Sequence, residues 1–363
     1  MSLLPTITEL QARARADLRM GVPVVLCLDD SSAIVAASET LSPARLKDLC
    51  ALGPAPVLAI TPRRAATLKA AAYSEHVARV LLPPDADCNW VRAIANPADD
   101  LRAPMKGPLR TRRDGDESLA RAAITFCKAA RLLPAALLVE VSDGTALADK
   151  YGLTRLNAEA AYPILHNTSP MHEVISARLP MQVSEAGRLH IFRPEDGGEE
   201  HYAVEIGQPA RDAPVLSRLH SACFTGDIIG SLKCDCGPQL RTALAEIGTE
   251  GNGVLLYLNQ EGRGIGLANK MRAYSLQDQG FDTVEANHRL GFEDDERDFR
   301  IGAALLLKLG FSQVRLMTNN PKKVEMMQAN GLVVTERVPL QVGQNAYNRD
   351  YLATKAKKSG HLL

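Results

Sequence analysis

Short apolar runs alternate with amphipathic segments along the first half of the chain. Apolar runs bounded by turn residues predict strands, which we expect at 22–29, 56–62 and 135–144. Apolar residues at helical spacing predict helices at 42–52, which opens with Ser-Pro, and at 116–133. Strands that alternate with helices indicate an α/β domain, which we place at residues 1–170.

The pattern resumes near Met171, after a linker that we expect over 157–173. Strands are expected at 175–183, 187–194, 199–207, 253–258, 313–317 and 332–340. Helices are expected at 238–251, 267–280, 296–310 and 322–331. The second half is therefore a second α/β domain, residues 171–363.

Composition narrows the classes of partner. Lys+Arg and Asp+Glu are balanced at 42 each, so no global field favours nucleic acid or an anionic membrane. Aromatic residues make up 4% of the chain, too few for a base-stacking platform. The sequence has neither a secretory signal nor an apolar run long enough to span a bilayer, so we expect a cytoplasmic protein with no membrane partner.

Three cysteines cluster in the second half, at Cys223, Cys234 and Cys236. A disulfide is disfavoured in a reducing compartment, and cysteines one residue apart bridge poorly. Thiolates are preferred ligands of Zn²⁺, so we interpret the cluster as a zinc site. Three protein ligands leave a position for water, as in catalytic sites, whereas His220 as a fourth ligand would close the site. The spacing favours the open site and leaves the closed one as an alternative.

Three further stretches carry chemistry that the residues alone leave open. The loop NQEGRGIG follows an expected strand, and its glycines permit close backbone approach to an anion, although it is also an ordinary Gly-rich turn. In MTNNPKKVE, Lys322 and Lys323 begin a helix, where cations are unfavourable unless an anion is present; two solvated lysines are the alternative. The acidic stretch 290–300 is either a helix start or a Mg²⁺ or acid–base site.

Together these motifs resemble GTP cyclohydrolase II, the first enzyme of riboflavin biosynthesis. The matching stretches are RLHSACFTGD, SLKCDCGPQL, LLYLNQEGRGIGLANKMRAYSLQDQGFDTVEANHRLGF, DERDF, TNNPKKVE and ERVPL, nearly continuous from about Ile175 onward. The resemblance implies a mixed sheet with flanking helices. It also implies zinc-dependent hydrolysis of GTP to 2,5-diamino-6-hydroxy-4-(5-phosphoribosylamino)pyrimidine, formate and pyrophosphate, with opening of the imidazole ring at carbon 8.

The resemblance further implies roles for individual residues. One catalytic Zn²⁺ per chain would be bound by Cys223, Cys234 and Cys236, and Mg²⁺ would accompany the triphosphate. Arg297 would be the nucleophile toward the α-phosphorus, Asp295 the proton acceptor, and Tyr274 would help complete hydrolysis at the zinc site. The GTP contacts would be Arg218, Leu219, His220, Ser221, Ala222, Gln239, Glu261, Gly262, Arg263, Thr283, Thr318 and Lys323. We also expect a homodimer.

Ala222 departs from the family pattern, which is usually R-V-H-S-E-C, where this chain has RLHSAC. The change removes a carboxylate beside a zinc ligand, and we expect it to alter substrate affinity or pocket shape rather than abolish zinc binding. It keeps open a paralogue that acts on another purine nucleotide or stops at the formamidopyrimidine. A non-catalytic nucleotide-sensing protein of flavin metabolism is a further alternative, against which the intact thiols, Asp295 and Arg297 argue.

The first half resembles, more faintly, 3,4-dihydroxy-2-butanone 4-phosphate synthase. The similar stretches are ADLRMGVPVVLCLDD, ITPRRAATLKA and AARLLPAALLVEV. The family's D-R-E-N-E-G-D loop is replaced by DDSSAIVAASE, and its G-H-T-E segment by SLAR at 118–121. Without those carboxylates and that histidine, Mg²⁺ has no ligand set. We therefore expect a domain that kept the fold, lost the reaction and now serves dimerisation, stability or regulation. A bifunctional enzyme would require this half to make dihydroxybutanone phosphate from ribulose 5-phosphate.

Overall fold

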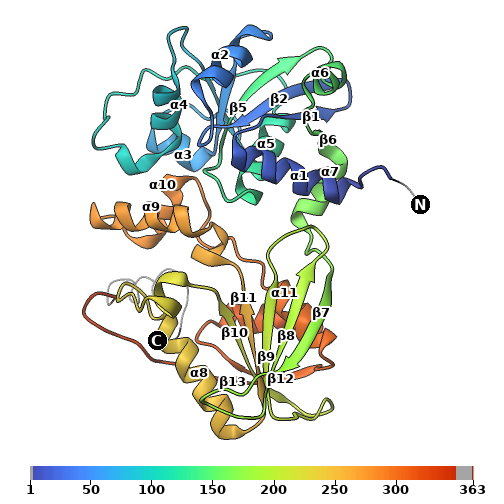
Figure 1. The fold of residues 1–363 in the computed structure, drawn as a ribbon. Helices are drawn as coiled ribbons and strands as arrows, with labels where there is room; N and C mark the ends of the chain where they lie inside the picture. Colours follow the sequence, from blue (N-terminus) through green and yellow to red (C-terminus); the bar gives the residue numbers. More distant parts are fainter. Residues whose placement is uncertain (1–2, 349–361, 363) are drawn as a thin grey trace. The chain divides into compact units, whose positions relative to one another are not determined.

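The computed structural model describes residues 3–348 and 362, which form two compact units (Figure 1). The first unit comprises Met1–Asn167 and Ala268–Glu296, and the second comprises Thr168–Leu267 and Arg297–Leu363. The chain thus returns to the first unit after most of the second has been built. Within the described residues, no helix combines the length and apolar character that crossing a membrane requires.

The first unit is built on a mixed sheet of six strands in the order β4-β3-β5-β2-β1-β6. The strands are β1 Val24–Leu28, β2 Ser31–Ala37, β3 Val57–Ile60, β4 Ala78–Leu81, β5 Ala135–Val141 and β6 Arg155–Asn157. All neighbouring pairs are antiparallel except β1 and β6. The three strands expected in this half are confirmed as β1, β3 and β5.

The helices of the first unit come from two parts of the chain. They are α1 Ile7–Met20, α2 Pro43–Ala51, α3 Pro62–Thr67, α4 Cys88–Ala95, α5 Ser118–Ala129, α6 Gly144–Tyr151 and α7 Ala158–His166, joined by α9 Leu267–Asp278 and α10 Thr283–Leu290 from the returning segment. Leu18 of α1, Phe126 of α5 and Ala161 of α7 pack in one buried cluster with strand residues such as Leu26 and Leu138. One sheet face is therefore covered by α1, α5 and α7.

The stretch expected as a linker, 157–173, contains the boundary between the two units at Asn167, but it also contains a helix that was not expected. Residues in this stretch form α7, and β7 begins at Met171. The Asn157 side chain accepts a hydrogen bond from the Ala160 N–H at 2.9 Å and caps α7, while Ala161 is fully buried. Pro163 lies inside the helix, where proline removes a backbone donor, so the local pattern gave no helix signal. Tertiary burial of the alanines stabilises the helix instead.

The second unit contains a seven-stranded mixed sheet in the order β13-β12-β10-β11-β9-β8-β7. A mixed sheet is what the resemblance implies, but the strand at 215–221 was not among those expected. The strands are β7 Met171–Arg178, β8 Gly187–Pro194, β9 His201–Ile206, β10 Val215–Ser221, β11 Gly253–Leu258, β12 Gln313–Met317 and β13 Val333–Val338. Strands β13, β12, β10 and β11 are parallel, and the remainder are antiparallel.

Helices cover both faces of the parallel part. Helix α8 (Cys236–Glu250) packs on one face, with Ile247 against Leu216 and Leu255 in one cluster. Helices α11 (Arg300–Lys308) and α12 (Pro321–Ala329) pack on the other face, where Leu219 and Leu256 point. The period-two alternation assigns neighbouring strand residues to opposite faces. Because β12, β10 and β11 are parallel, the loops that follow them emerge at the same edge of the sheet, formed by the carboxyl ends of the strands. Open α/β sheets bind ligands at this edge.

A buried ionic cluster stabilises the first unit. Arg64, whose side chain is 2% exposed, donates to the Asp100 carboxylate at 2.6 and 2.9 Å, and Lys106 also donates to it. Burial raises the pKa of Asp100, but the hydrogen bonds from the two cations outweigh it, so the net pKa is lowered. The carboxylate therefore stabilises the fold above its unfolded-state pKa, and this contribution is lost as the pH falls through the lowered value.

We predict that Asp100→Asn lowers the free energy of unfolding of the first unit by about 3 kcal/mol, because it leaves a buried guanidinium unpaired. Chemical denaturation followed by circular dichroism measures the loss. The matched control is Asp99→Asn, since Asp99 is 55% exposed and pairs with Arg102 at 3.6 Å. Equal stability of the two variants would contradict the prediction.

Candidate metal centre and substrate site

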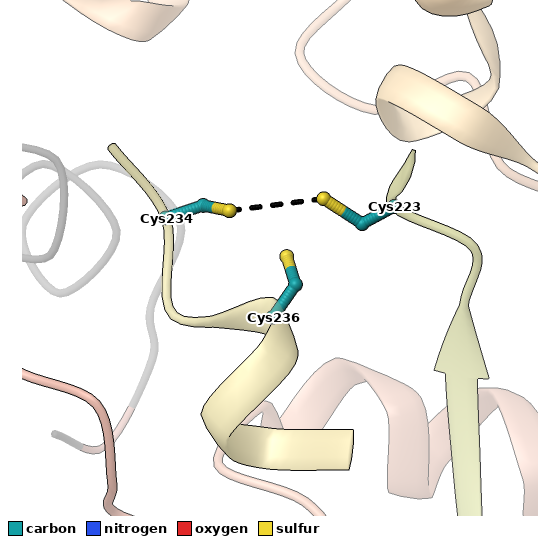
Figure 2. A group of neighbouring side chains, drawn as sticks. All are labelled: Cys223, Cys234 and Cys236. Atoms are coloured by element: carbon teal, nitrogen blue, oxygen red, sulfur yellow. Dashed lines mark hydrogen bonds between the residues drawn. The ribbon is translucent and has the colours of Figure 1, made fainter. Parts of the chain in front are cut away.

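Three thiols meet where β10 ends and α8 begins (Figure 2). The Sγ atoms of Cys223, Cys234 and Cys236 all lie within 4.8 Å of one another, and those of Cys223 and Cys234 are 3.7 Å apart. Cys223 and Cys234 are buried. Among the described residues this is the one group of three or more Cys, His, Asp or Glu side chains that can hold a metal ion.

Two glycines permit this approach. A Cβ on Gly226 would lie 2.8 Å from the Cys234 Sγ and 3.1 Å from the Cys223 Sγ. A Cβ on Gly237, at the start of α8, would lie 2.1 Å from the Gly226 carbonyl oxygen. Any side chain at Gly226 would therefore fill the space between the thiols.

The arrangement fits a tetrahedral thiophilic ion. Metal–sulfur bonds of about 2.3 Å place tetrahedral sulfur ligands about 3.8 Å apart, close to the observed spacing. Without a cation the thiols oppose one another's ionisation: the pKa of Cys234 is raised, first by its hydrogen bond with Cys223, and that of Cys236 is raised well above its usual value for the same reason. A bound cation stabilises the thiolates and so allows neighbouring thiols to be deprotonated together.

His220 does not complete a four-ligand site in this arrangement. It lies outside the metal-competent group formed by the described residues. Its Nε2 faces the Asp227 carboxylate at 3.0 and 3.1 Å, and its ring stacks on Tyr257 with centroids 5.5 Å apart. Burial lowers the pKa of His220 although Asp227 opposes this, which favours the neutral ring. The geometry supports the open, three-thiol alternative.

Asp227 is a residue that the sequence reasoning missed. Its side chain is 1% exposed and accepts hydrogen bonds from the Cys223 backbone N–H and the Tyr257 hydroxyl, both at 3.0 Å. Burial and the nearby carboxylate raise the pKa of Tyr257, so its hydroxyl remains a donor. Asp227 thus fixes the backbone of Cys223, one of the three clustered thiol residues. Its place four residues after Cys223 was the available signal.

Arg218, on β10, forms hydrogen bonds with residues of neighbouring elements. Its guanidinium donates to the Met317 carbonyl at 2.9 Å and to the Gln239 side-chain oxygen at 2.5 Å, and Gln239 donates to Asp235 at 2.6 Å. Burial lowers the pKa of Arg218 to about 10, which leaves it charged at neutral pH. Its buried Nε has no hydrogen-bond partner among the described residues, so the strand presents a cation with spare donor capacity.

Two more cations flank one aromatic ring. The Arg297 guanidinium lies 4.7 Å and the Lys323 ammonium 4.6 Å from the centroid of the Phe299 ring. Arg297 also donates to the Ser221 hydroxyl at 3.3 Å, and Lys323 to the Leu219 carbonyl at 3.5 Å. Lys323 is buried in the first turn of α12. Buried positive charge at a helix start favours an anion.

The loop that follows β11, residues 259–266 (the glycine loop), contacts the connection between β10 and α8, residues 222–235 (the thiol loop). Glu261 accepts from the Phe224 N–H at 2.6 Å and from the Gly262 N–H at 2.7 Å. Gly262 and Arg263 adopt left-handed backbone angles, with φ of 64° and 61°. Positive φ is uncommon outside glycine, so Arg263 is held in a strained conformation. Thr318, after β12, is buried and accepts from the Asn320 N–H at 3.1 Å.

The predicted site residues divide between the units. The second unit holds the three thiols and Arg218, Leu219, His220, Ser221, Ala222, Gln239, Glu261, Gly262, Arg263, Arg297, Thr318 and Lys323. The first unit holds Tyr274, Thr283 and Asp295. Contacts within the second unit bring together the thiol loop, the glycine loop and the buried cations, whereas the participation of the other three remains a prediction.

These features define an α/β protein with a three-thiol group that can hold a metal ion and with buried cations at one edge of a sheet. A family model described as GTP cyclohydrolase II matches residues 172–339. The chain is 44% identical to the GTP cyclohydrolase-2 of Azospirillum brasilense over 359 residues, covering 97% of this chain and 93% of that protein. It is 57% identical to GTP cyclohydrolase-2 of Pseudomonas aeruginosa over 190 residues, covering 52% of this chain and 92% of that protein. The chain belongs to the GTP cyclohydrolase II family.

Solved structures give a more distant likeness. A two-domain 3,4-dihydroxy-2-butanone 4-phosphate synthase from A. baumannii is similar with a TM-score of 0.33 and 14% identity, covering 92% of this chain and 99% of that one. The cation-free form of a 3,4-dihydroxy-2-butanone 4-phosphate synthase is similar with a TM-score of 0.34, over 42% of this chain and 95% of that one.

We predict that Asp227→Asn lowers Zn²⁺ affinity by about tenfold or more, because the amide cannot accept all three hydrogen bonds that position the Cys223 loop. Competition with a chromophoric chelator measures the affinity directly. Asp212→Asn, on an exposed loop of the same unit, serves as the control. Affinities that match wild type in the Asp227 variant would show that the loop holds its shape without the carboxylate.

Proposed function

We propose that this chain is a zinc-dependent GTP cyclohydrolase II. It hydrolyses GTP to 2,5-diamino-6-hydroxy-4-(5-phosphoribosylamino)pyrimidine, formate and pyrophosphate, the first step of riboflavin biosynthesis. The observation that carries the proposal is the three-thiol group, which fits one tetrahedral metal ion in a chain of this family. A cytoplasmic homodimer is part of the same proposal.

Cys223, Cys234 and Cys236 would hold the ion. When bound, Zn²⁺ supplies Lewis-acid chemistry for hydrolysis. The chain's own contribution is to fix three soft ligands and leave the fourth side open, since His220 is turned toward Asp227. The open side is where the purine would be presented for opening of its imidazole ring.

The buried cations would bind the triphosphate. Arg218 and Lys323 are desolvated, so their attraction for phosphate oxygens is less screened than on an exposed surface. Lys323 adds its charge to the start of α12. Mg²⁺ would accompany the triphosphate and offset its remaining charge.

Three residues would act at the reacting atoms. Arg297 would attack the α-phosphorus, so that pyrophosphate leaves, and Asp295 would accept the proton that Arg297 gives up. Tyr274 would help complete hydrolysis of the ring. Ser221 supports this assignment by accepting a hydrogen bond from Arg297, which fixes the guanidinium. The remaining proposed GTP contacts are Leu219, His220, Ser221, Ala222, Gln239, Glu261, Gly262, Arg263, Thr283 and Thr318.

The decisive experiment incubates the zinc-loaded chain with GTP and Mg²⁺ and quantifies formate, pyrophosphate and the pyrimidine in one run. We expect equal amounts of all three. Cys234→Ser should lose bound zinc and formate release together, because two thiols and a hydroxyl hold Zn²⁺ poorly. Full turnover by a variant that keeps one zinc per chain would refute the metal assignment. Formate from another purine nucleotide but not from GTP would favour the paralogue.

We predict that Arg297→Ala abolishes pyrophosphate release, lowering it by about a thousandfold or more, because an attacking group is removed rather than a binding contact. Zinc content should stay at the wild-type level, since Arg297 is not one of the three thiol residues that would hold the ion. Pyrophosphatase converts the released pyrophosphate to phosphate, and a phosphate assay then gives the rate of pyrophosphate release. A wild-type rate in this variant would exclude the nucleophile role.

A further inference from the structure

The returning segment, Ala268–Glu296, belongs to the same compact unit as the first half of the chain. It carries Tyr274, Thr283 and Asp295, which the proposed function assigns to the site. We infer that the first unit is a positioning platform: it holds the returning segment in place and thereby controls cyclohydrolase turnover. This inference rests on the proposed function and gives the first half a task other than the synthase reaction.

An ion pair fixes α9. Arg272 donates to the two Glu39 carboxylate oxygens at 2.8 and 3.3 Å, and both side chains are about one-fifth exposed (22% and 20%). Glu39 also accepts from the Leu133 backbone N–H at 2.8 Å, so its own position is set by the first half. Arg272 precedes Tyr274 by two residues on the same helix. A half-buried bidentate pair is stronger than an exposed one.

Both ends of α9 are also bonded to the first half. Near its start, the fully buried Asn269 donates to the Arg131 carbonyl at 3.2 Å and accepts from Arg272 at 2.6 Å. Just past its end, Gln279 donates to the Ala98 carbonyl at 3.1 Å. These bonds fix the rotation of the helix about its axis, which sets the direction of every side chain on it.

Helix α10 packs beside α3, as Figure 1 shows. Gly291 follows α10 with φ of 90°, and a Cβ there would lie 2.6 Å from the Thr61 hydroxyl and 2.9 Å from the Pro134 ring. Leu290 and Phe292 on either side are each 1% exposed. The segment is therefore packed as core rather than laid on a surface, with no room for a side chain at Gly291.

Cations of the first half hold the acidic stretch on both sides of Asp295. Arg63 on α3 donates to the Glu293 carboxylate at 2.5, 3.0 and 3.1 Å, and Lys128 on α5 donates to Glu296 at 2.6 Å. The hydrogen bond from Arg63 lowers the pKa of Glu293, so the pair stays ionised at neutral pH. Asp295 is thus fixed between two anchored neighbours.

The test reverses the charges of the pair formed by Arg63 and Glu293 in the full zinc-loaded chain. Arg63→Glu and Glu293→Arg should each speed hydrogen–deuterium exchange in 268–296 and lower kcat for GTP about fivefold. The double variant should restore both. Arg272→Ala should lower kcat about tenfold, because it leaves Glu39 unpaired. Zinc content should not change in any variant.

Glu140→Arg is the matched control, since Glu140 pairs with Arg112, a residue of the first half, and its side chain is 54% exposed, close to the 57% of Glu293. It should leave exchange in 268–296 and kcat at wild-type values. Faster exchange without loss of kcat, or a loss of kcat that the double variant does not restore, would overturn the inference. If the wild-type chain does not turn over GTP, the proposed function is refuted. Hydrogen–deuterium exchange in 268–296 still shows whether the Arg63–Glu293 pair holds the returning segment in place.

Discussion

The close approach of the chain to itself at Gly226 is the constraint on which the metal centre depends. The glycine lies between the thiols of Cys223 and Cys234, and its carbonyl contacts the first turn of α8 at Gly237. A single strand–helix connection, from β10 to α8, can therefore bring three sulfur atoms together without a dedicated metal-binding module. The parallel order of β12, β10 and β11 then places the glycine loop, Thr318 and Lys323 at the same edge. The three thiols and the groups that favour an anion lie close together because they follow strands that end at the same edge of the sheet.

Much of this site was accessible from the sequence because its signals are local. Cysteine spacing indicated the metal group, and strand–glycine–helix junctions indicated the anion loops. Asp227 was not predicted, because its role depends on a turn that folds its carboxylate back onto the Cys223 N–H and onto Tyr257 from another strand. Helix α7 was mistaken for a linker, because its stability comes from burial of alanines rather than from local propensity.

The return of Ala268–Glu296 to the first unit was equally inaccessible to periodicity. An amphipathic helix shows which of its faces is buried but not which surface buries it. The partners of α9 and α10, including Glu39, Thr61 and Arg131, lie more than 100 residues earlier in the chain. A sequence boundary drawn between two domains consequently separates residues that pack in one core.

The substitution at Ala222 can be understood from the same contacts. The backbone N–H groups of Cys223 and Phe224 are each held by a carboxylate, from Asp227 and Glu261 respectively. The Ala222 N–H pairs with the Leu258 carbonyl at 2.8 Å as an extension of the sheet. The path of the metal-binding loop is thus set by backbone hydrogen bonds, to which the side chain at position 222 contributes nothing. An alanine at position 222 is therefore compatible with the geometry of the three thiols.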